Sequence, residues 1–390
     1  KVYRSPIVTY RIKRFESIIK KLDRFPRMQF SRMGDIGGCR VILNSETAIY
    51  KLYEKLDKLL IITKIKDYIK EPAKDGYKSF HIYATLPNDN TTIEIQLRSP
   101  DHQNWATMVE ISDFLFDSKL KEYGEDKLLV KFHKYLSHDM DELSLKQKKY
   151  IVDILIKYKY LEELQRVFSR NYINTRIRWI EIEKKQSNQN YFLIQSDKYQ
   201  TPRIDSFPNF QEAEQEYLRR YKLNSGANMV LTHTTNSKYK TISIAYSNYI
   251  LSYHSYINKF YEILEDLIKE SIEKDNKFRF WKYFKFHREM TAIRAITLVK
   301  EISTADTLLK FTFKNNKLDI TKKVKSSRRL DWLVDIKNEI KKQSKINHSI
   351  IEAIKIYKKH NYINREIYWN LIRYVMWNNN RKIRKVILNK

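Results

Sequence analysis

The chain has 390 residues, of which 42% are apolar, so it is long enough for two or three domains with hydrophobic cores. It carries 75 Lys and Arg residues against 46 Asp and Glu residues, a formal net charge of +29. Such a charge favours a polyanionic partner, namely a nucleotide, a nucleic acid or an acidic membrane surface. The alternative is a lysine-rich composition whose side chains are simply solvated.

A single cysteine, Cys39, excludes an intramolecular disulfide framework and a site of four thiolates, and it fits a reducing cytoplasm. No segment approaches about 18 consecutive uncharged apolar residues, so we expect no transmembrane helix and no membrane partner. No signal-peptide pattern follows Lys1. Because the first residue is not Met, we expect that the sequence starts inside a longer protein.

The first 120 residues predict a mixed α/β domain, because helical and strand-like hydrophobic spacings alternate along them. Ser45 is a typical N-cap and opens an amphipathic segment. The alternation on either side of the turn "PNDN" is typical of an antiparallel hairpin. We therefore expect helices over residues 10–25, 45–60 and 102–116, a buried strand over 35–45, and a hairpin of strands over 78–86 and 91–99.

The rest of the chain changes character twice. Residues 130–190 have helical spacing, and residues 190–257 read as strand, helix, strand and helix, which suggests a small second α/β unit. Most of the remainder reads as helical and basic, and residues 321–390 contain 19 Lys and Arg residues against 5 Asp and Glu residues. Residues 307–324 are expected to form a hairpin that turns at "NNK". The expected domains are residues 1–125, 126–257 and 258–390.

Four clusters of polar residues fall in the first hundred residues. In "RIKRFESIIKK", Arg11, Lys13, Ser17 and Lys21 recur at spacings that can present cations to a triphosphate. A solvated basic helix face is the alternative. In "GDIGGCR", Asp35 lies directly before the predicted buried strand, which is a common place for a Mg²⁺ ligand. Capping of the turn is the alternative role of this carboxylate.

The third cluster is the loop and strand "KDYIKEPAKDGYKSFHIY". Tyr77 follows a glycine and could offer its ring to a nucleotide base, while Ser79 and His81 share one face of the next strand. Lysines in this stretch, among them Lys66 and Lys74, could hold phosphates. The alternative is a basic entry to a hairpin, with its tyrosines in the core.

The fourth cluster is "TTIEIQLRS", in which Glu94, Gln96 and Arg98 alternate with apolar residues. This alternation places a carboxylate, an amide and a guanidinium in a row on one face of a strand. Such a row suits a metal ligand or a base beside a phosphate clamp, although a surface strand has the same pattern.

Together and in this order, the four clusters resemble RelA/SpoT-type alarmone synthetase domains. The matching stretches are "RIKRFESIIKK", "DIGGCR", "KDYIKEPAKDGYKSFH" and "EIQLR", and "HQNWATMVE" is similar to the helix that follows in that family. The resemblance covers roughly residues 10–116 and is looser over residues 190–257. It implies a nucleotidyltransferase-like mixed five-stranded sheet with flanking helices, followed here by the small α/β unit and the basic, mostly helical region.

The resemblance also implies an activity. Members of this family transfer pyrophosphate from ATP to the ribose 3′-hydroxyl of GDP or GTP, which makes (p)ppGpp and releases AMP. Mg²⁺ is then implied as cofactor, held by Asp35 and Glu94, with Glu94 also able to act as the base for the attacking hydroxyl. The implied ATP side is Arg11, Lys13, Ser17, Lys21 and Arg40. The implied acceptor side is Lys66, Lys74, Ser79, His81, Gln96 and Arg98, together with Tyr77 stacked on the acceptor base.

A toxin branch of the family instead modifies the 3′ end of tRNA to block translation, and two features keep this alternative open. Ala73 stands where the family usually has a lysine, directly after the loop proline, which weakens the expectation of GDP or GTP as acceptor. The net charge and the basic C-terminal region suit contacts with RNA.

A catalytically inactive nucleotide or RNA sensor is a third hypothesis, which the presence of both Asp35 and Glu94 opposes. A role in phage defence rests on architecture alone, and the sequence leaves the oligomeric state open.

Overall fold

The computed structural model describes residues 6–291 apart from short gaps, and beyond them only residues 312–314, 317–319, 355 and 359. The gaps are residues 86–90, 117, 119, 121–125, 165–173, 176, 180, 183–188, 197–201, 225–227, 234–238 and 247–253. The chain divides into two compact units, one of Lys1–Leu143 and Arg170–Tyr256, the other of Ser144–Ser169 and Ile257–Lys390. Within the described part, no helix is both long enough and apolar enough to cross a membrane.

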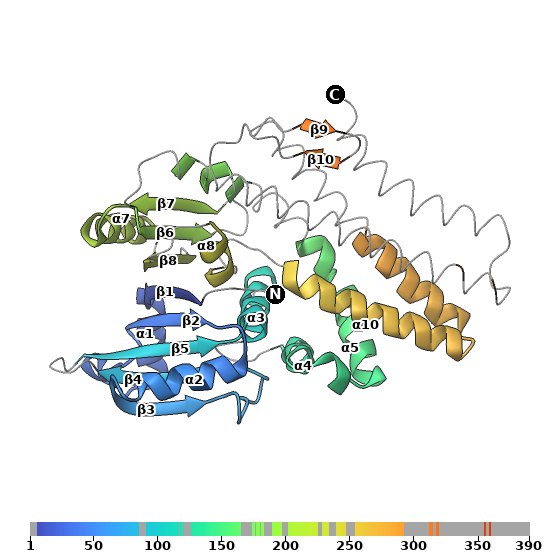
Figure 1. Ribbon diagram of the computed structural model, residues 1–390, viewed down its shortest axis with the longest axis horizontal. Helices are drawn as coiled ribbons and strands as arrows, with labels where there is room; N and C mark the ends of the chain where they lie inside the picture. The colour runs from blue at the N-terminus through green and yellow to red at the C-terminus, as the bar shows by residue number, and fades with distance from the viewer. Residues whose placement is uncertain are drawn as a thin grey trace. The chain divides into compact units, whose positions relative to one another are not determined.

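The first unit is built on one mixed sheet, whose described strands lie in the order β3-β4-β5-β2-β1-β8-β6-β7 (Figure 1). β2 and β5 are parallel, and the other neighbouring pairs are antiparallel. The strands are β1 (Ile7–Ile12), β2 (Gly37–Ile42), β3 (Ile61–Asp67), β4 (Phe80–Thr85), β5 (Thr92–Arg98), β6 (Tyr191–Ser196), β7 (Arg203–Phe207) and β8 (Asn228–His233).

Helices lie on both faces of this sheet (Figure 1). The helices of this unit are α1 (Phe15–Arg24), α2 (Glu46–Leu56), α3 (Pro100–Phe116), α4 (Lys127–Leu136), α7 (Phe210–Leu223) and α8 (Tyr239–Ala245), with 3₁₀ turns η1 (Phe30–Arg32) and η2 (Met140–Glu142). The prediction of Ser45 as an N-cap is confirmed, because its side chain accepts a hydrogen bond from the backbone N–H of Ala48 at 3.2 Å.

The predicted mixed five-stranded sheet is confirmed as the strands β3, β4, β5, β2 and β1. The strands of the second α/β segment extend it, since β8 pairs with β1 and is followed by β6 and β7. The predicted buried strand is β2, and the predicted hairpin is the antiparallel pair β4 and β5. β3 and β7 were not predicted. β3 is half-exposed and β7 lies at the edge of the sheet, so neither has the uniform apolar run of a buried strand.

The prediction of a helix from residue 10 is wrong at its start. Residues up to Ile12 form β1, and the helix begins only at Phe15. The stretch "IVTYRI" alternates between the two faces of the sheet and pairs along its whole length with β2, so the ladder of hydrogen bonds outweighs the helical spacing of Ile12 and Phe15. Lys13 therefore lies in the connection between β1 and α1 and not on the helix.

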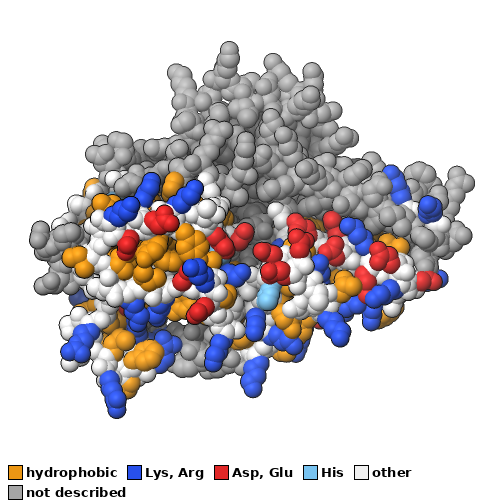
Figure 2. Space-filling view, turned by 60° about the horizontal axis from the view of Figure 1, so that its bottom comes forward, with side chains coloured by type: hydrophobic (Ala, Val, Ile, Leu, Met, Phe, Trp, Pro, Cys, Tyr) orange, Lys and Arg blue, Asp and Glu red, His pale blue; other side chains and the backbone are white. Residues whose placement is uncertain are grey.

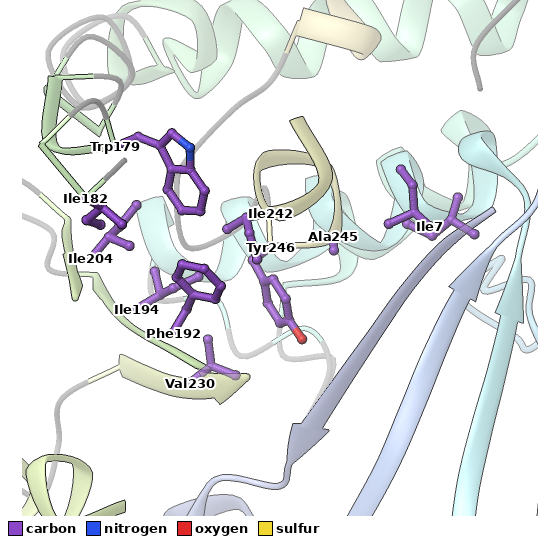
Figure 3. Packing of buried hydrophobic residues seen from close by; sticks show 11 residues of the cluster. Ile7, Trp179, Ile182, Phe192, Ile194, Ile204, Val230, Ile242, Ala245 and Tyr246 are labelled. Atoms are coloured by element: carbon purple, nitrogen blue, oxygen red, sulfur yellow. The ribbon is translucent and has the colours of Figure 1, made fainter. Parts of the chain in front are cut away.

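Two hydrophobic clusters hold the sheet, one on each face. On one face, Ile7 and Ile42 pack with residues of α8, including Ile242 and Ala245. Figure 3 shows the same cluster continuing to Trp179, whose ring stacks on Phe192 with centroids 5.1 Å apart. On the other face, α2 packs through its buried residue Ile49 against side chains of β2, β4 and β5 (Val41, Phe80, Ile82, Ala84, Ile95 and Leu97). The centre of the sheet is thus fixed from both sides.

The second unit contains α5 (Leu145–Lys157), α10 (His254–Glu273) and a helix over residues 277–291. Ion pairs join these helices, among them Lys148 with Asp266 at 2.7 Å and Lys149 with Glu270 at 2.9 Å. The hairpin expected within residues 307–324 is present as the antiparallel pair β9 (Thr312–Lys314) and β10 (Lys317–Asp319). The basic tail over residues 321–390 lies outside the described residues, apart from residues 355 and 359.

Candidate active site

Strand register places the predicted polar residues on one face of the sheet. In the parallel pair of β2 and β5, Gly38 lies opposite Glu94 and Arg40 lies opposite Gln96. In the antiparallel pair of β4 and β5, His81 lies opposite Gln96. Directly opposite residues share a face, so the row on β5 continues onto both neighbouring strands.

Five of the predicted side chains form a closed ring of hydrogen bonds on this face. Arg98 donates from Nη2 to the hydroxyl of Tyr77 at 2.8 Å, and that hydroxyl lies 2.8 Å from Nε2 of His81. Nδ1 of His81 lies 3.0 Å from Oε1 of Glu94. Gln96 donates from Nε2 to Oε2 of Glu94 at 2.8 Å, and its Oε1 accepts from Nη2 of Arg98 at 3.2 Å. Four residues predicted for the acceptor side thus share one hydrogen-bonded network with the carboxylate of Glu94.

Glu94 is held as a carboxylate. Burial opposes its ionisation, but hydrogen bonding to His81 and the positive charge of that ring, with further hydrogen bonds from Tyr83 and Gln96, lower the pKa of Glu94 well below its usual range. The hydroxyl of Tyr83 donates to Oε1 at 2.8 Å. Burial works against protonation of His81, yet its contacts with Tyr77 and Glu94 raise the pKa of the His81 ring. The pair is therefore an ion pair, with the negative charge on Glu94.

Tyr77 is set in the ring by the loop that precedes β4. Gly76 adopts φ +92°, and its N–H donates to the carbonyl of Ala73 at 2.8 Å, which closes a tight turn. The Tyr77 ring lies near Tyr68, His81 and Trp105, with centroids 5.6, 5.8 and 5.9 Å away. In this conformation its hydroxyl points to His81 and Arg98, so the ring is anchored at one end.

The Tyr77 phenol is also unusually acidic. Burial opposes its ionisation, but the charges of Arg98 and His81 outweigh burial and lower the pKa of Tyr77 to about 7. The Arg98 guanidinium lies over the Tyr77 ring as well, with Cζ 5.4 Å from the centroid. Arg98 thus binds both the oxygen and the face of this tyrosine.

A second group of predicted residues lies around Asp35. The amine of Lys13 lies 2.5 Å and the amine of Lys21 lies 2.8 Å from the same oxygen, Oδ2 of Asp35. Burial opposes ionisation of Asp35, but the hydrogen bonds and charges of the two lysines lower the pKa of its carboxyl. Two cations on one carboxylate leave a surplus of positive charge, which suits a triphosphate.

Asp35 and Glu94 also suit a magnesium ion. The buried Oδ1 of Asp35 has no hydrogen-bond partner among the described residues. Both carboxylates line one small cavity with Lys13, Gly38 and Gln96. No group of three or more acidic, His or Cys side chains that could hold a metal occurs in the described part of the chain. A two-carboxylate site completed by water and phosphate oxygens is the usual form for Mg²⁺, so these residues fit it.

The remaining predicted residues make other contacts, although Ser79 also hydrogen-bonds to Tyr77 and Arg40 lines the cavity with Asp35 and Glu94. Nη1 of Arg40 donates to the backbone carbonyl of Ala245 at 2.9 Å, beneath α8. Ser79 is buried and its hydroxyl donates to the carbonyl of Leu97 at 3.2 Å. The amine of Lys66 lies 5.9 Å from the centroid of the Tyr68 ring, Lys74 is exposed on the loop, and Ser17 is half-buried on α1. Arg11 lies in β1, but its side chain is outside the described residues.

The cavity that Asp35 and Glu94 line, beside Arg40, measures about 10 Å³. That volume admits about one water molecule.

Two residues of the network were missed by the sequence interpretation. Tyr83 donates to Glu94, and Gln103 of α3 accepts a hydrogen bond from Nη1 of Arg98 at 2.9 Å. Tyr83 could have been found, since it follows His81 by two residues and so shares its face of the strand. Gln103 could not, because only the packing of α3 brings its amide to Arg98.

Part of the chain also matches known proteins. Residues 10–114 match the family model described as a region found in RelA / SpoT proteins. GTP pyrophosphokinase YwaC of Bacillus subtilis (strain 168) is 30% identical over 152 residues, which make up 36% of this chain and 71% of that protein. GTP pyrophosphokinase YjbM of the same organism is 29% identical over 130 residues, which make up 30% of this chain and 62% of that protein.

The chain is also similar to parts of two solved structures. Small alarmone synthetase 1 of Bacillus subtilis bound to its product pppGpp is 26% identical, over 33% of this chain and 70% of that chain, with a TM-score of 0.29. Small alarmone synthetase 2 of Bacillus subtilis is 27% identical, over 40% of this chain and 83% of that chain, with a TM-score of 0.28. On its identity with YwaC over 71% of that protein, and on the family match at residues 10–114, this chain belongs to the RelA/SpoT family and is a pyrophosphotransferase.

Proposed function

We propose that this chain transfers pyrophosphate from ATP to the ribose 3′-hydroxyl of GDP or GTP. The observation that carries the proposal is the closed ring of Tyr77, His81, Glu94, Gln96 and Arg98, on the sheet face whose small cavity also has Asp35 and Lys13 in its wall. One part of this face offers cations for a triphosphate. The other offers a carboxylate and an aromatic ring for a nucleoside.

The reaction balances as a single displacement. The 3′-oxygen of the acceptor bonds to the β-phosphorus of ATP, the bond from that phosphorus to the bridging oxygen of the α-phosphate breaks, and AMP leaves while the hydroxyl loses its proton. Such a transfer needs in-line positioning and neutralisation of charge more than covalent help from the protein. Lys13 and Lys21, which converge on Asp35 within 3 Å, supply positive charge at a fixed point.

Asp35 and Glu94 are the residues that would hold Mg²⁺, which when bound supplies positive charge to the transferring phosphates. Glu94 is ionised throughout the physiological pH range, because its pKa lies below the usual range. That state suits a metal ligand. His81 beside it stabilises the carboxylate, and the same low pKa makes Glu94 a poor acceptor for the proton of the 3′-hydroxyl.

The acceptor end of the site consists of Tyr77, Arg98 and the loop before β4. The loop is held in shape by the N–H of Tyr77, which donates to Oδ1 of Asp75 at 3.0 Å, and by the N–H of Ala73, which donates to the carbonyl of Tyr77 at 3.1 Å. We assign the exposed Lys74 and the half-buried Lys66 to the phosphates of the acceptor. A base placed on this loop would meet the Tyr77 ring, consistent with the predicted stacking.

The 3′ end of tRNA is the second candidate acceptor, favoured by the alanine at position 73 and by the net charge of +29. On the face shown in Figure 2, Lys and Arg side chains are spread over the surface with acidic and hydrophobic side chains between them. They do not gather there into one basic patch. RNA contacts are therefore proposed for the basic C-terminal region rather than for this face.

A transfer assay tests the proposal and separates the acceptors. The protein is incubated with Mg²⁺ and γ-labelled ATP, and with GDP, GTP or deacylated tRNA in parallel, beside the Glu94→Gln variant. Label in a guanosine nucleotide that the variant does not produce supports the first acceptor class, and label on tRNA supports the second. No label with any acceptor would overturn the proposal and favour an inactive sensor, and equal label in wild type and variant would overturn the role assigned to Glu94.

A further inference from the structure

A polar cavity of about 240 Å³ lies at the far edge of the sheet, against the edge strand β7. Arg178, Arg203 and Arg220 line it, together with Asp205 and Glu216. β7 is five strands away from β5, which carries the catalytic carboxylate. At about 4.8 Å per strand, the cavity is about 24 Å from the candidate active site. It is therefore a separate site, and the proposed reaction does not use it.

The charges around this cavity do not balance. Oδ1 of Asp205 accepts from Arg178 at 2.9 Å, and Oδ2 accepts from Arg203 at 2.7 Å and from Arg220 at 2.5 Å. Glu216 accepts from Nε of Arg220 at 2.7 Å. Arg178 also donates to Glu181 at 2.8 Å, and Glu216 also accepts from Arg219 at 2.7 Å. Four guanidinium groups thus meet three carboxylates, which leaves a surplus of one positive charge.

One of these guanidinium groups has a nitrogen donor without an acceptor among the described residues. Arg220 is only 6% exposed, and its Nη1 has no hydrogen-bond partner among the described residues. Leaving a buried charged donor unpaired costs about 1–3 kcal/mol or more, so native proteins rarely keep one without a ligand or an ion nearby. Arg203 stands at the mouth with its side chain 58% exposed, and it contacts Asp205 through Nε. Its two outer nitrogens are then directed away from that contact.

We propose that this cavity binds a terminal phosphate group of a small phosphorylated ligand of the nucleotide class. A tetrahedral oxyanion can take the free donor of Arg220 and the outer nitrogens of Arg203 at once, since the planar guanidinium fork matches phosphate geometry. The hydroxyl of Ser206 and the apolar ring of Phe207 also line the cavity. Its volume suits a pyrophosphate or a nucleotide terminus inserted end-on, whereas a nucleic-acid backbone would contact only the rim.

Calorimetric titration with inorganic pyrophosphate, without ATP, tests this assignment. The titration uses the full chain in a Lys21→Gln background, which weakens binding at the candidate active site and so isolates the cavity. Arg203→Gln is the test variant, and Arg219→Gln is the matched control. Arg219 is 56% exposed and pairs with Glu216, whose carboxylate lines the cavity, but Arg219 itself does not line it. Thermal melting of each variant verifies that it folds.

We expect Arg203→Gln to weaken pyrophosphate binding at least tenfold and Arg219→Gln to change it less than about twofold. Titration with GDP in parallel distinguishes a phosphate carried on a nucleoside from free pyrophosphate, and dependence of either on Arg203 supports the proposal. Equal binding by both variants, or no binding in the Lys21→Gln background, overturns it. Arg203-dependent binding of a hydroxyl-terminated oligoribonucleotide alone also overturns it, in favour of a nucleic-acid backbone. None of these readouts depends on whether the transfer reaction occurs.

Discussion

Gly38 and Glu94 face each other across the parallel pair of β2 and β5, so closely that a Cβ atom on Gly38 would lie 2.3 Å from the carbonyl oxygen of Glu94. At the neighbouring Gly37, an added Cβ would meet nothing within 4 Å. The glycine at position 38 therefore lets the two strands pair at the point where the candidate catalytic carboxylate projects. The pair of glycines offers a test with its own control.

We expect Gly38→Ala to lower the free energy of unfolding by about 1–3 kcal/mol, because the backbone of β5 has to move to admit the methyl group. Transfer activity should fall at least tenfold, since Glu94 moves with that backbone. Gly37→Ala should change the free energy of unfolding by less than about 0.5 kcal/mol. Urea unfolding and the transfer assay measure both effects. Equal losses in the two variants would contradict the close approach at Gly38.

Tyr77 should titrate near neutral pH, because the charges of Arg98 and His81 lower the pKa of its phenol to about 7. The chain has 28 tyrosines, so the measurement is the ultraviolet tyrosinate absorbance of wild type minus that of Tyr77→Phe as pH is raised. We expect one tyrosinate to appear in the difference between about pH 6 and 8. A difference that stays flat until the range of ordinary tyrosines near pH 10 would count against the ring of hydrogen bonds.

The lowered pKa of Tyr77 also makes the free energy of unfolding depend on pH. The folded-state pKa of Tyr77 lies below the ordinary tyrosine value of about 10, so ionisation stabilises the folded protein fully above pH 10, and this stabilisation disappears as pH falls through about 7. The free energy of unfolding of wild type should therefore rise relative to Tyr77→Phe between pH 7 and 10. Denaturant unfolding at several pH values verifies the direction. A constant difference would show that the phenol does not ionise in the fold.

His133 should make the fold sensitive to acid. Its ring is 1% exposed, Nε2 lies 2.8 Å from the hydroxyl of Ser112, and burial lowers the pKa of His133 to about 3. Below the ordinary histidine pKa of about 6.5, the unfolded chain binds a proton at this ring that the folded protein does not bind. The free energy of unfolding should thus fall by about 1.4 kcal/mol per pH unit through this group.

His133→Gln should be less stable at neutral pH, since it loses packing, but its stability should depend less on pH between about 6 and 4. His138→Gln is the matched control, because His138 lies in the same segment and is half-buried. It should keep the slope of wild type. Urea unfolding across this range measures both slopes, and an unchanged slope in His133→Gln would refute the assignment.

Local patterns in the sequence were enough to predict the features that depend on neighbouring residues. The period of two along β5 correctly placed Glu94, Gln96 and Arg98 on one face, and the N-cap at Ser45 is where the pattern put it. The end of the strand at Ile12 could not be predicted from a local pattern of this kind. There the spacing of apolar residues fits a helix and a strand alike, and pairing with β2 decides between them.

Contacts between distant segments could not be predicted. β8 joins β1 through pairing of Tyr10 with His233, more than 200 residues apart, and nothing local in either stretch specifies its partner. The same holds for the cavity at β7, where Arg178, Arg203 and Arg220 come from three separate elements. In the sequence each is one basic residue among 75 Lys and Arg residues. Only the fold shows which of them converge.

Arg40 is a predicted site residue that also makes a buried structural contact. The resemblance assigns it to ATP, whereas in the structure its guanidinium is buried and donates at 2.9 Å to the carbonyl of Ala245, which also accepts from Gln103 at 3.3 Å. A buried hydrogen bond from a charged donor contributes about 1.5–3 kcal/mol. We therefore expect Arg40→Gln to lower the free energy of unfolding by that amount, even without nucleotide.

The matched control is Arg27→Gln, which removes the same charge from an exposed arginine and should leave the free energy of unfolding within about 0.5 kcal/mol of wild type. Urea unfolding without ATP measures the stability of both variants, and amide hydrogen exchange of α8 reports where the loss occurs. Faster exchange over residues 239–245 in Arg40→Gln locates it at the Ala245 contact. Equal stability and equal exchange in the two variants would mean that Arg40 is free to serve ATP alone, because α8 would then remain in place without it.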